Sequence, residues 1–246
     1  MPGANCGACG FPGCRQFAEA FVKAETSEAL RCPACGDEVM QKIAALLGKD
    51  VVARDPMIAV VRCAGSFENR PRMSVYDSTR ECAIASYLYS GDTGCAYGCL
   101  GLGDCVRSCR FDAISIDKTT GLPVVSEEKC TACGACVIAC PRHILELRKK
   151  GKKRMRVFVS CVNEDKGAVA RRVCSVACIG CGLCVKECPF DAITLKNNLA
   201  YIDFEKCKLC RKCVAVCPTH AIHEVNFPPR KEPAPKKDAG EKKGVA

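Results

Sequence analysis

Residues 178–218 read CIGCGLCVKECPFDAITLKNNLAYIDFEKCKLCRKCVAVCP, and this stretch decides the fold. Its two ends each hold a C-x2-C-x2-C-x3-C-P run, from Cys178 to Pro189 and from Cys207 to Pro218. Four cysteines at this spacing are typical of thiolate ligands to an iron–sulfur cluster, whereas a disulfide framework has no reason to repeat the run. Between the runs, ITLK and LAYID flank an Asn-Asn turn, which predicts a β-hairpin.

The same arrangement occurs upstream as an internal repeat. Residues 109–114 (CRFDAI) match residues 188–193 (CPFDAI), ISID and LPVV predict a second hairpin, and a complete run extends from Cys130 to Pro141. Each repeat looks like a bacterial two-cluster ferredoxin module, in which the fourth cysteine of each run ligates the other cluster. The sequence therefore predicts an α+β fold, with a small N-terminal helical 4Fe–4S domain followed by two ferredoxin-like 2[4Fe–4S] modules and linking segments.

This resemblance assigns two ligand sets in the second module. One [4Fe–4S] cluster takes Cys178, Cys181, Cys184 and Cys217. The other takes Cys188, Cys207, Cys210 and Cys213.

The first module departs from the pattern at one ligand. Leu102 stands where the second repeat has Cys181, and leucine cannot ligate iron. Cys95, which matches Cys174 in the second repeat, is predicted to replace it. The alternative is that this site is degenerate and empty. The predicted sets are Cys95, Cys99, Cys105 and Cys140 for one cluster, and Cys109, Cys130, Cys133 and Cys136 for the other.

The N-terminal segment predicts a further site. NCGACGFPGC at residues 5–14 is a tight glycine-rich loop, followed by helical patterns at residues 15–30 and 37–47 that end near Gly48. The proposed ligands are Cys6, Cys9, Cys14 and Cys32. Structural zinc is the alternative, because zinc also takes four thiolates. Cys35 is either a spare thiol or a rival to Cys32.

Two apolar segments suggest a sixth site. Residues 57–63 (MIAVVRC) and 156–161 (RVFVSC) both predict strands that end in cysteine, and each is followed by a second cysteine. Side by side, the strands would bring together Cys63, Cys82, Cys161 and Cys174. Ordinary buried thiols are the alternative. We therefore expect five [4Fe–4S] clusters and treat a sixth as a hypothesis.

Composition narrows the class of protein. The chain has 25 Cys and a formal net charge of +10, but each oxidised cluster with its thiolates adds negative charge, so the loaded protein is near neutral and nucleic acid is not an expected partner. The basic segment 148–156 reads as solvated surface or a docking patch. No apolar signal region opens the chain and no apolar run could span a bilayer, which predicts a cytoplasmic protein.

The predicted boundaries follow from these motifs. They are 1–48 for the N-terminal cluster domain, 49–90 for a linking segment, 91–150 for the first module, 151–173 for an inserted strand and linker, 174–226 for the second module and 227–246 for a Pro- and Lys-rich disordered tail.

GANCGACGFPGC at the start, GCAYGCLGLGDCVRSC and the paired cysteine runs together resemble the long, cluster-rich B subunit of Rnf complexes. That resemblance implies a membrane complex that couples electron flow from reduced ferredoxin to NAD with ion translocation. In that family the B subunit accepts the ferredoxin electrons. The family usually begins with a transmembrane helix, and this chain starts after the corresponding position. The expected location is therefore the cytoplasmic face of the membrane, with ferredoxin and the other subunits as partners.

Electron relay is the predicted role, with no catalytic residue for an organic substrate, because no G-x-G-x-x-G fingerprint for a nicotinamide or flavin lies between a strand and a helix. Two alternatives are an iron–sulfur component of a corrinoid or carbon-monoxide enzyme and a metal-storage or interaction protein with structural zinc.

Overall fold

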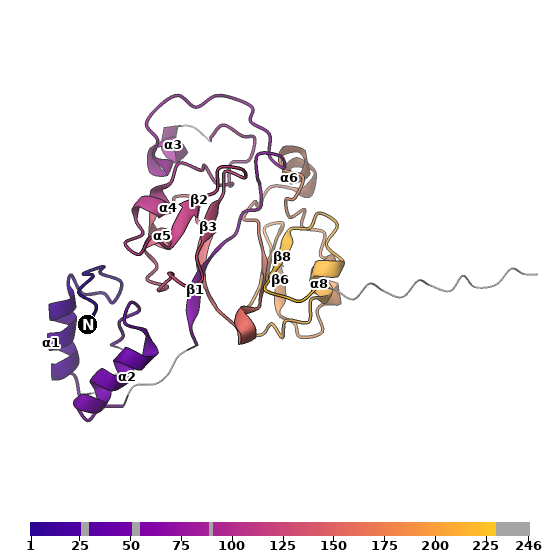
Figure 1. Cartoon of the computed structure of the whole chain (residues 1–246). Helices are drawn as coiled ribbons and strands as arrows, with labels where there is room; N and C mark the ends of the chain where they lie inside the picture. Colours follow the sequence, from indigo (N-terminus) through magenta and orange to yellow (C-terminus); the bar gives the residue numbers. More distant parts are fainter. Residues whose placement is uncertain (26–29, 51–54, 89–90, 230–246) are drawn as a thin grey trace, which may run out of the picture.

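The computed structural model describes residues 1–25, 30–50, 55–88 and 91–229. Most of the predicted tail, residues 230–246, lies outside the described residues. Figure 1 shows the helical N-terminal domain at one end, the first module in the middle and the second module at the other end. None of the helices in these ranges is both long and apolar enough to cross a membrane.

The N-terminal domain is a pair of helices, α1 (Cys14–Lys23) and α2 (Gly36–Leu46). Phe17 and Phe21 lie one helical turn apart on α1 and pack with Met40 and Ala44 of α2 in one buried core. Helix α1 ends earlier than predicted, where the backbone of Ala24 becomes extended, and the Lys49 ammonium donates hydrogen bonds to the carbonyls at this end, at 2.9 Å to Val22 and 2.6 Å to Ala24. The predicted end of α2 near Gly48 is confirmed, since Gly48 adopts φ 65°.

Both predicted hairpins are present. In the first module β2 (Ile114–Ile116) pairs antiparallel with β3 (Pro123–Val125), and in the second β6 (Ile193–Lys196) pairs with β7 (Leu199–Ile202). Asn197 and Asn198 both have positive φ, as the tight turn between β6 and β7 requires. Short helices follow the cysteine loops: α4 (Asp104–Arg107), α5 (Ala135–Ala139), α7 (Leu183–Glu187) and α8 (Lys212–Ala215).

Each module gains a strand from the segment before it. Strand β1 (Met57–Val61) pairs antiparallel with β4 (Leu145–Lys149), and β5 (Arg156–Val159) pairs antiparallel with β8 (Ile222–Val225). The predicted strands therefore exist, but they pair with strands of their own modules rather than with each other. Helix α3 (Cys82–Leu88) and the 3-10 helix η1 (Lys152–Arg154) lie between β1 and β5 along the chain, and α6 (Gly167–Val173) follows β5.

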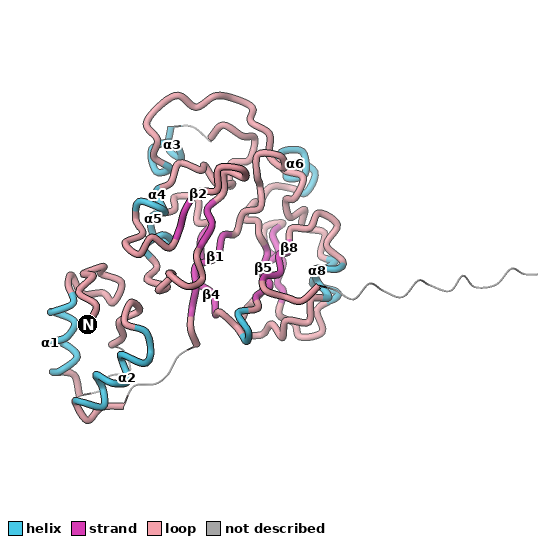
Figure 2. Tube along the Cα trace, in the orientation of Figure 1, coloured by secondary structure: helices cyan, strands magenta, loops and turns pink. Residues whose placement is uncertain are grey.

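The two added strands meet at their ends and along one face. The Ala64 amide donates a hydrogen bond to the Ser160 carbonyl at 3.1 Å, which places Cys63 and Cys161 beside each other. Ile58 and Val60 of β1 share a buried cluster with Phe158 of β5. Figure 2 shows the β1–β4 and β5–β8 ribbons near each other in the middle of the molecule.

The basic segment 148–156 is partly buried, contrary to its interpretation as solvated surface. The Arg148 guanidinium is enclosed by Phe158, Tyr201 and Phe204 and pairs with Glu146. Arg156 is also buried. The sequence pattern did not reveal either burial, because both arginines face the junction of the modules.

The ion pair between Arg156 and Glu127 joins the two modules, and its removal gives a first prediction. Arg156 donates to Glu127, which also accepts from the Asn226 side-chain amide at 2.9 Å. Burial raises the pKa of the Glu127 carboxyl, but the hydrogen bond and charge of Arg156 outweigh it, so the pKa lies below its usual value of 4.5. Since the folded pKa is depressed, this stabilisation is present above pH 4.5 and is lost as the pH falls through the folded pKa.

We expect Glu127→Gln to lower the free energy of unfolding by about 3 kcal/mol at pH 7, because it leaves a buried guanidinium without its carboxylate. The measurement is denaturant unfolding under anaerobic conditions at pH 7 and at pH 4. The matched control is Glu128→Gln, whose carboxylate is exposed. Equal stability of the two variants at pH 7 would contradict the prediction.

Candidate iron–sulfur sites

Four cavities of nearly equal size lie in the two modules, each lined by four cysteines. Each has a volume of about 20 Å³. The cysteine sets are Cys63, Cys95, Cys161 and Cys174; Cys82, Cys99, Cys105 and Cys140; Cys109, Cys130, Cys133 and Cys136; and Cys178, Cys181, Cys184 and Cys217. Because the four cavities share the same size and the same set of four thiol donors, they fit the same kind of bound group.

A fifth group of thiols lies at the other end of the second module. Burial raises the pKa of Cys213 to about 12, and the Cys207 and Cys210 thiolates add to the rise, followed by Cys184 and Cys188. Charges act over short distances, so these thiols lie near Cys213, and Cys188 and Cys207 also pack in the same cluster as Cys213. The structure thus brings together both cysteine sets predicted for this module.

The first module groups its cysteines differently from the prediction. Cys82, not Cys95, lines the cavity with Cys99, Cys105 and Cys140. The physical reason is the position of α3, whose first two amides, at Cys82 and Ala83, donate to the Asp104 carboxylate at 2.8 and 3.0 Å. Asp104 opens α4, so this contact folds α3 over the cavity and delivers the Cys82 thiol.

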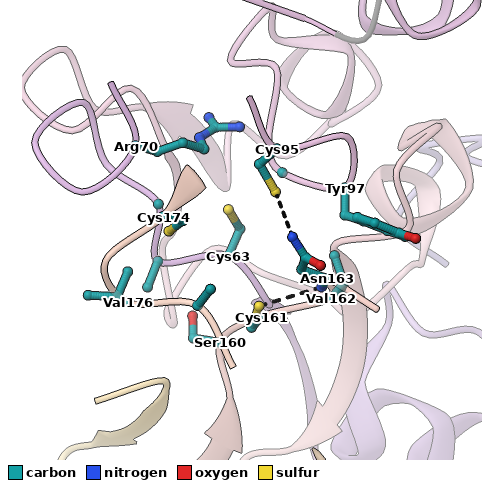
Figure 3. Close-up of a pocket in the computed structure, with 14 residues that line it drawn as sticks. Cys63, Arg70, Cys95, Tyr97, Ser160, Cys161, Val162, Asn163, Cys174 and Val176 are labelled. Atoms are coloured by element: carbon teal, nitrogen blue, oxygen red, sulfur yellow. Dashed lines mark hydrogen bonds between the residues drawn. The ribbon is translucent and has the colours of Figure 1, made fainter. Parts of the chain in front are cut away.

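Cys95 lies in another cavity, with Cys63, Cys161 and Cys174 (Figure 3). The set predicted for a sixth site is therefore corrected at one position, since Cys95 replaces Cys82. The internal repeat already indicated this grouping, because Cys95 matches Cys174 in the second repeat and both cysteines line this cavity. We call this the inter-module site, because the first module and the strand segment before it supply Cys95 and Cys63, and the second module and the strand segment before it supply Cys174 and Cys161.

Asn163 supplies hydrogen bonds to two of these sulfurs. It is almost fully buried, its side-chain amide donates to Cys95 Sγ at 3.4 Å and its backbone amide donates to Cys161 Sγ at 3.5 Å. The Asp165 amide donates to the Asn163 side-chain oxygen at 2.7 Å, which orients the Nδ2 group toward Cys95. Amide donors to sulfur stabilise the thiolate form.

The N-terminal site combines loop cysteines with one buried cysteine. Cys14 opens α1, and its backbone amide donates to Asn5 Oδ1 at 2.8 Å, which closes the loop. Cys32 is buried in the core of this domain, with Cys9 and Cys35 packed beside it. Burial raises the pKa of Cys35 to about 12, and its neighbour Cys32 adds to the rise. Cys35 is thus adjacent to Cys32, and both remain candidates for the fourth ligand.

The donor chemistry fits a cationic group larger than a single ion. Within residues 1–25, 30–50, 55–88 and 91–229, no group of three or more Cys, His, Asp or Glu is arranged to hold one metal ion. The thiols instead surround cavities. Burial raises the pKa of Cys184 and Cys136 to about 11, so the thiols need a bound cation to ionise at neutral pH. Four thiolates around a cavity are the donor set of a [4Fe–4S] cluster.

Neighbouring sites are near enough to interact through their charges. Burial raises the pKa of Cys105 to about 12. The Cys82 and Cys140 thiolates of its own site raise this pKa further, and so does the Cys136 thiolate of the neighbouring site. Burial also raises the pKa of Cys99. The second-largest cause of that rise is the charge of the Cys63 thiolate in the inter-module site.

Neighbouring sites in the second half of the chain also interact through their charges. Burial raises the pKa of Cys161 to about 12, and Cys178 of the following site acts on it in both directions, since its backbone hydrogen bond lowers the pKa and its thiolate charge raises it. Cys184 of that site in turn affects Cys213. The N-terminal loop contacts the first module, because the Arg110 guanidinium beside Cys109 donates to the Asn5 carbonyl at 2.6 Å. The sites therefore form one continuous series along the described chain.

Two known families match the chain. The family described as "4Fe-4S dicluster domain" matches residues 94–144, 129–192 and 177–221, and the family described as "Putative Fe-S cluster" matches residues 1–34. With the fold and the cysteine-lined cavities, these matches define an iron–sulfur protein with multiple 4Fe–4S sites.

Three relatives match over most of this chain. The B subunit of the Na(+)-translocating ferredoxin:NAD(+) oxidoreductase complex of Acetobacterium woodii is 45% identical over 222 residues, which are 90% of this chain and 65% of that protein. The B subunit of an ion-translocating oxidoreductase complex of Methanosarcina acetivorans is 44% identical over 222 residues, 90% of this chain and 82% of the relative. The B subunit of the proton-translocating ferredoxin:NAD(+) oxidoreductase complex of Clostridium ljungdahlii is 41% identical over 227 residues, with coverages of 92% and 78%. The chain belongs to the family of B subunits of ion-translocating oxidoreductase complexes, and it spans just under two thirds of the length of the Acetobacterium relative.

Proposed function

We propose that this chain is the electron-transfer B subunit of a membrane complex that oxidises reduced ferredoxin, reduces NAD and translocates ions, and that it holds six [4Fe–4S] clusters. The observation that carries the proposal is the set of four equal cavities, each with four cysteines, in a chain of this family. When bound, each cluster supplies a site for one electron. The two-electron reduction of NAD takes place on another subunit.

Six ligand sets use 24 of the 25 cysteines. Four are the cavity-lining sets given above. The fifth is Cys188, Cys207, Cys210 and Cys213, and the sixth is Cys6, Cys9 and Cys14 with Cys32. Cys35 is then the remaining thiol, held by its contacts with Cys32 and Met1 near the N-terminal site.

The order of the series follows from the contacts between sites. From the N-terminal site, electrons would pass through the Cys109 site, the Cys82 site, the inter-module site and the Cys178 site to the Cys207 site, or in the reverse direction. The protein's own contribution is to bury the sulfurs, donate amide hydrogen bonds to them and keep successive sites close. No proton or organic group has to move with the electron.

The exposed end of the second module is the proposed docking surface for ferredoxin. Cys210 is exposed, so the edge of its site is accessible to a partner. Lys206, Lys208 and Lys212 flank it in the sequence, and all three are exposed. Their positive charge complements an acidic redox protein and would speed its association.

Reduction by ferredoxin tests both proposals. We expect reduced ferredoxin to bleach the visible absorbance of the iron- and sulfide-reconstituted chain under anaerobic conditions. In the triple variant K206E/K208E/K212E the second-order rate should fall about tenfold at low ionic strength, with the difference narrowing at high salt because the interaction is screened.

The matched control is K42E/K118E/K166E, which reverses three exposed lysines elsewhere on the chain. Equal rates for the two triple variants would exclude the docking surface but not the function. A parent chain with its full iron content that ferredoxin does not reduce would overturn the function itself.

A further inference from the structure

Arg70 lies at the wall of the inter-module site. It is one of the residues that line this cavity, and Figure 3 shows it on the side of Cys95 and Cys174. Only 7% of the residue is exposed. A Cβ atom on Gly98 would collide with its guanidinium, and one on Gly65 would lie 3.2 Å from Arg70 Nε. Two glycines therefore leave the room that the side chain occupies.

This buried cation has no carboxylate partner within the described residues, unlike the other buried arginines there. Arg148 pairs with Glu146 and Arg156 pairs with Glu127. Arg70 Nη2 donates to the Cys99 carbonyl at 2.5 Å, and the Nε–H group is buried without a hydrogen-bond acceptor among the described residues. A buried guanidinium is costly unless nearby negative charge compensates it.

Among the described residues that line the cavity, the thiolates alone can supply negative charge. Burial raises the pKa of Cys174, and Arg70 acts against that rise. Arg70 has the same opposing effect at Cys99 of the neighbouring site. The Arg70 side chain thus lies between two cysteine sites, because the residue lines the inter-module cavity and its Nη2 group contacts the Cys99 carbonyl of the neighbouring site.

The turn that carries Arg70 is attached to the second module. The Arg70 amide donates to the Ser66 carbonyl at 2.9 Å, which closes the turn. Next to it, the Ser175 amide donates to the Asn69 carbonyl at 2.9 Å, and the Ser175 hydroxyl donates to the Asn69 side-chain oxygen at 2.7 Å. Ser175 follows Cys174, so the position of the cation is tied to a ligand from the other module.

We propose that Arg70 is a positioning residue that raises the reduction potential of the cluster in the inter-module site, because its guanidinium stabilises the negative charge gained on reduction. The step adds one electron, delivered by a neighbouring cluster, and breaks or forms no bond. The inference rests on the proposed function, since it requires a cluster in this site. The cluster in the middle of the series would then have a higher reduction potential than its burial alone would produce.

The test is an equilibrium redox titration followed by EPR on the reconstituted full chain, with Arg70→Gln and Arg70→Lys compared with the parent. In Arg70→Gln we expect one couple to become at least tenfold harder to reduce, which is about 59 mV for one electron, with iron content unchanged. Arg70→Lys keeps the charge and should recover most of the shift. Arg156→Gln, which removes a buried guanidinium outside the cavity lining, should leave every couple in place.

A titration of Arg70→Gln that superimposes on the parent overturns the inference. So does loss of iron without a shifted couple, because Arg70 would then hold the site together rather than set its potential. A shift of equal size in Arg156→Gln would also overturn it, since general loosening would explain both.

The double variant Cys161→Ala/Cys174→Ala separates this inference from the proposed function. If it loses about four irons per chain and one couple, the inter-module cluster exists. Adding Arg70→Gln to that background should then move no couple by tenfold, whereas a shift there would assign the effect to the Cys99 site and overturn the inference. If the double variant loses no iron, the inter-module cluster is absent and the assignment of six clusters fails.

Discussion

The double variant Cys82→Ala/Cys140→Ala will lose about four irons per chain, whereas Cys95→Ala/Cys140→Ala will lose about eight. Cys82 and Cys140 line the same cavity, so their removal disables one site. Cys95 and Cys140 line different cavities, so the second variant disables two. Both variants remove two thiols, and the difference between them depends only on how the cysteines are grouped.

Iron and sulfide quantitation after anaerobic reconstitution makes the measurement, with EPR spin integration as a second count. Cys178→Ala/Cys217→Ala is the control, because it disables one site in the other module and should also lose about four irons. A parent value near 24 irons would agree with about six clusters of four irons each. The reverse order of losses, with Cys95 and Cys140 costing about four irons and Cys82 and Cys140 about eight, would restore the grouping predicted from sequence.

Removal of iron by a chelator is expected to unfold both ferredoxin modules. Three of the six buried residues in the core of the first module are cysteines, and the rest are Ile114, Ile144 and Leu145. Its helices α4 and α5 have four and five residues, and every sheet in the described chain has two strands. Neither element is stable alone in water. The clusters therefore take the place of a larger apolar core, and their loss should cost on the order of 10 kcal/mol, as for other structural metal sites.

Far-UV circular dichroism and limited proteolysis during chelation would check this expectation. The dichroism signal and the resistance to protease should both be lost in parallel with the visible absorbance. Reconstitution with iron and sulfide should restore both, because metal binding and folding are coupled. Retention of protease-resistant modules in iron-free protein would contradict it and would mean that the apolar contacts suffice.

Local patterns in the sequence predicted both hairpins and, in the second module, the three loop cysteines of each site. These features depend on short spacings: three loop cysteines must wrap one cluster, and Asn197 and Asn198 must turn one hairpin. A resemblance to two-cluster ferredoxins then supplied the exchanged fourth cysteine. Where the relation between residues is local and the module's motif is complete, as in the second module, the pattern was enough; in the first module, where Leu102 interrupts the motif, it was not.

Cys82 and Arg70 show where that information ended. Neither belongs to a spaced motif, and their positions depend on how the chain between β1 and the first module folds back, with Asp104 holding the start of α3 and Asn69 holding Ser175.

The sequence by itself determined that this protein binds iron–sulfur clusters in repeated modules, because thiolate spacing within a loop is a property of the local chain. Only the tertiary structure decided which distant cysteines share a cavity, and which cation lies against them. Those choices come from packing and hydrogen bonds between segments far apart along the chain, and such contacts leave no periodic trace in the residues that make them.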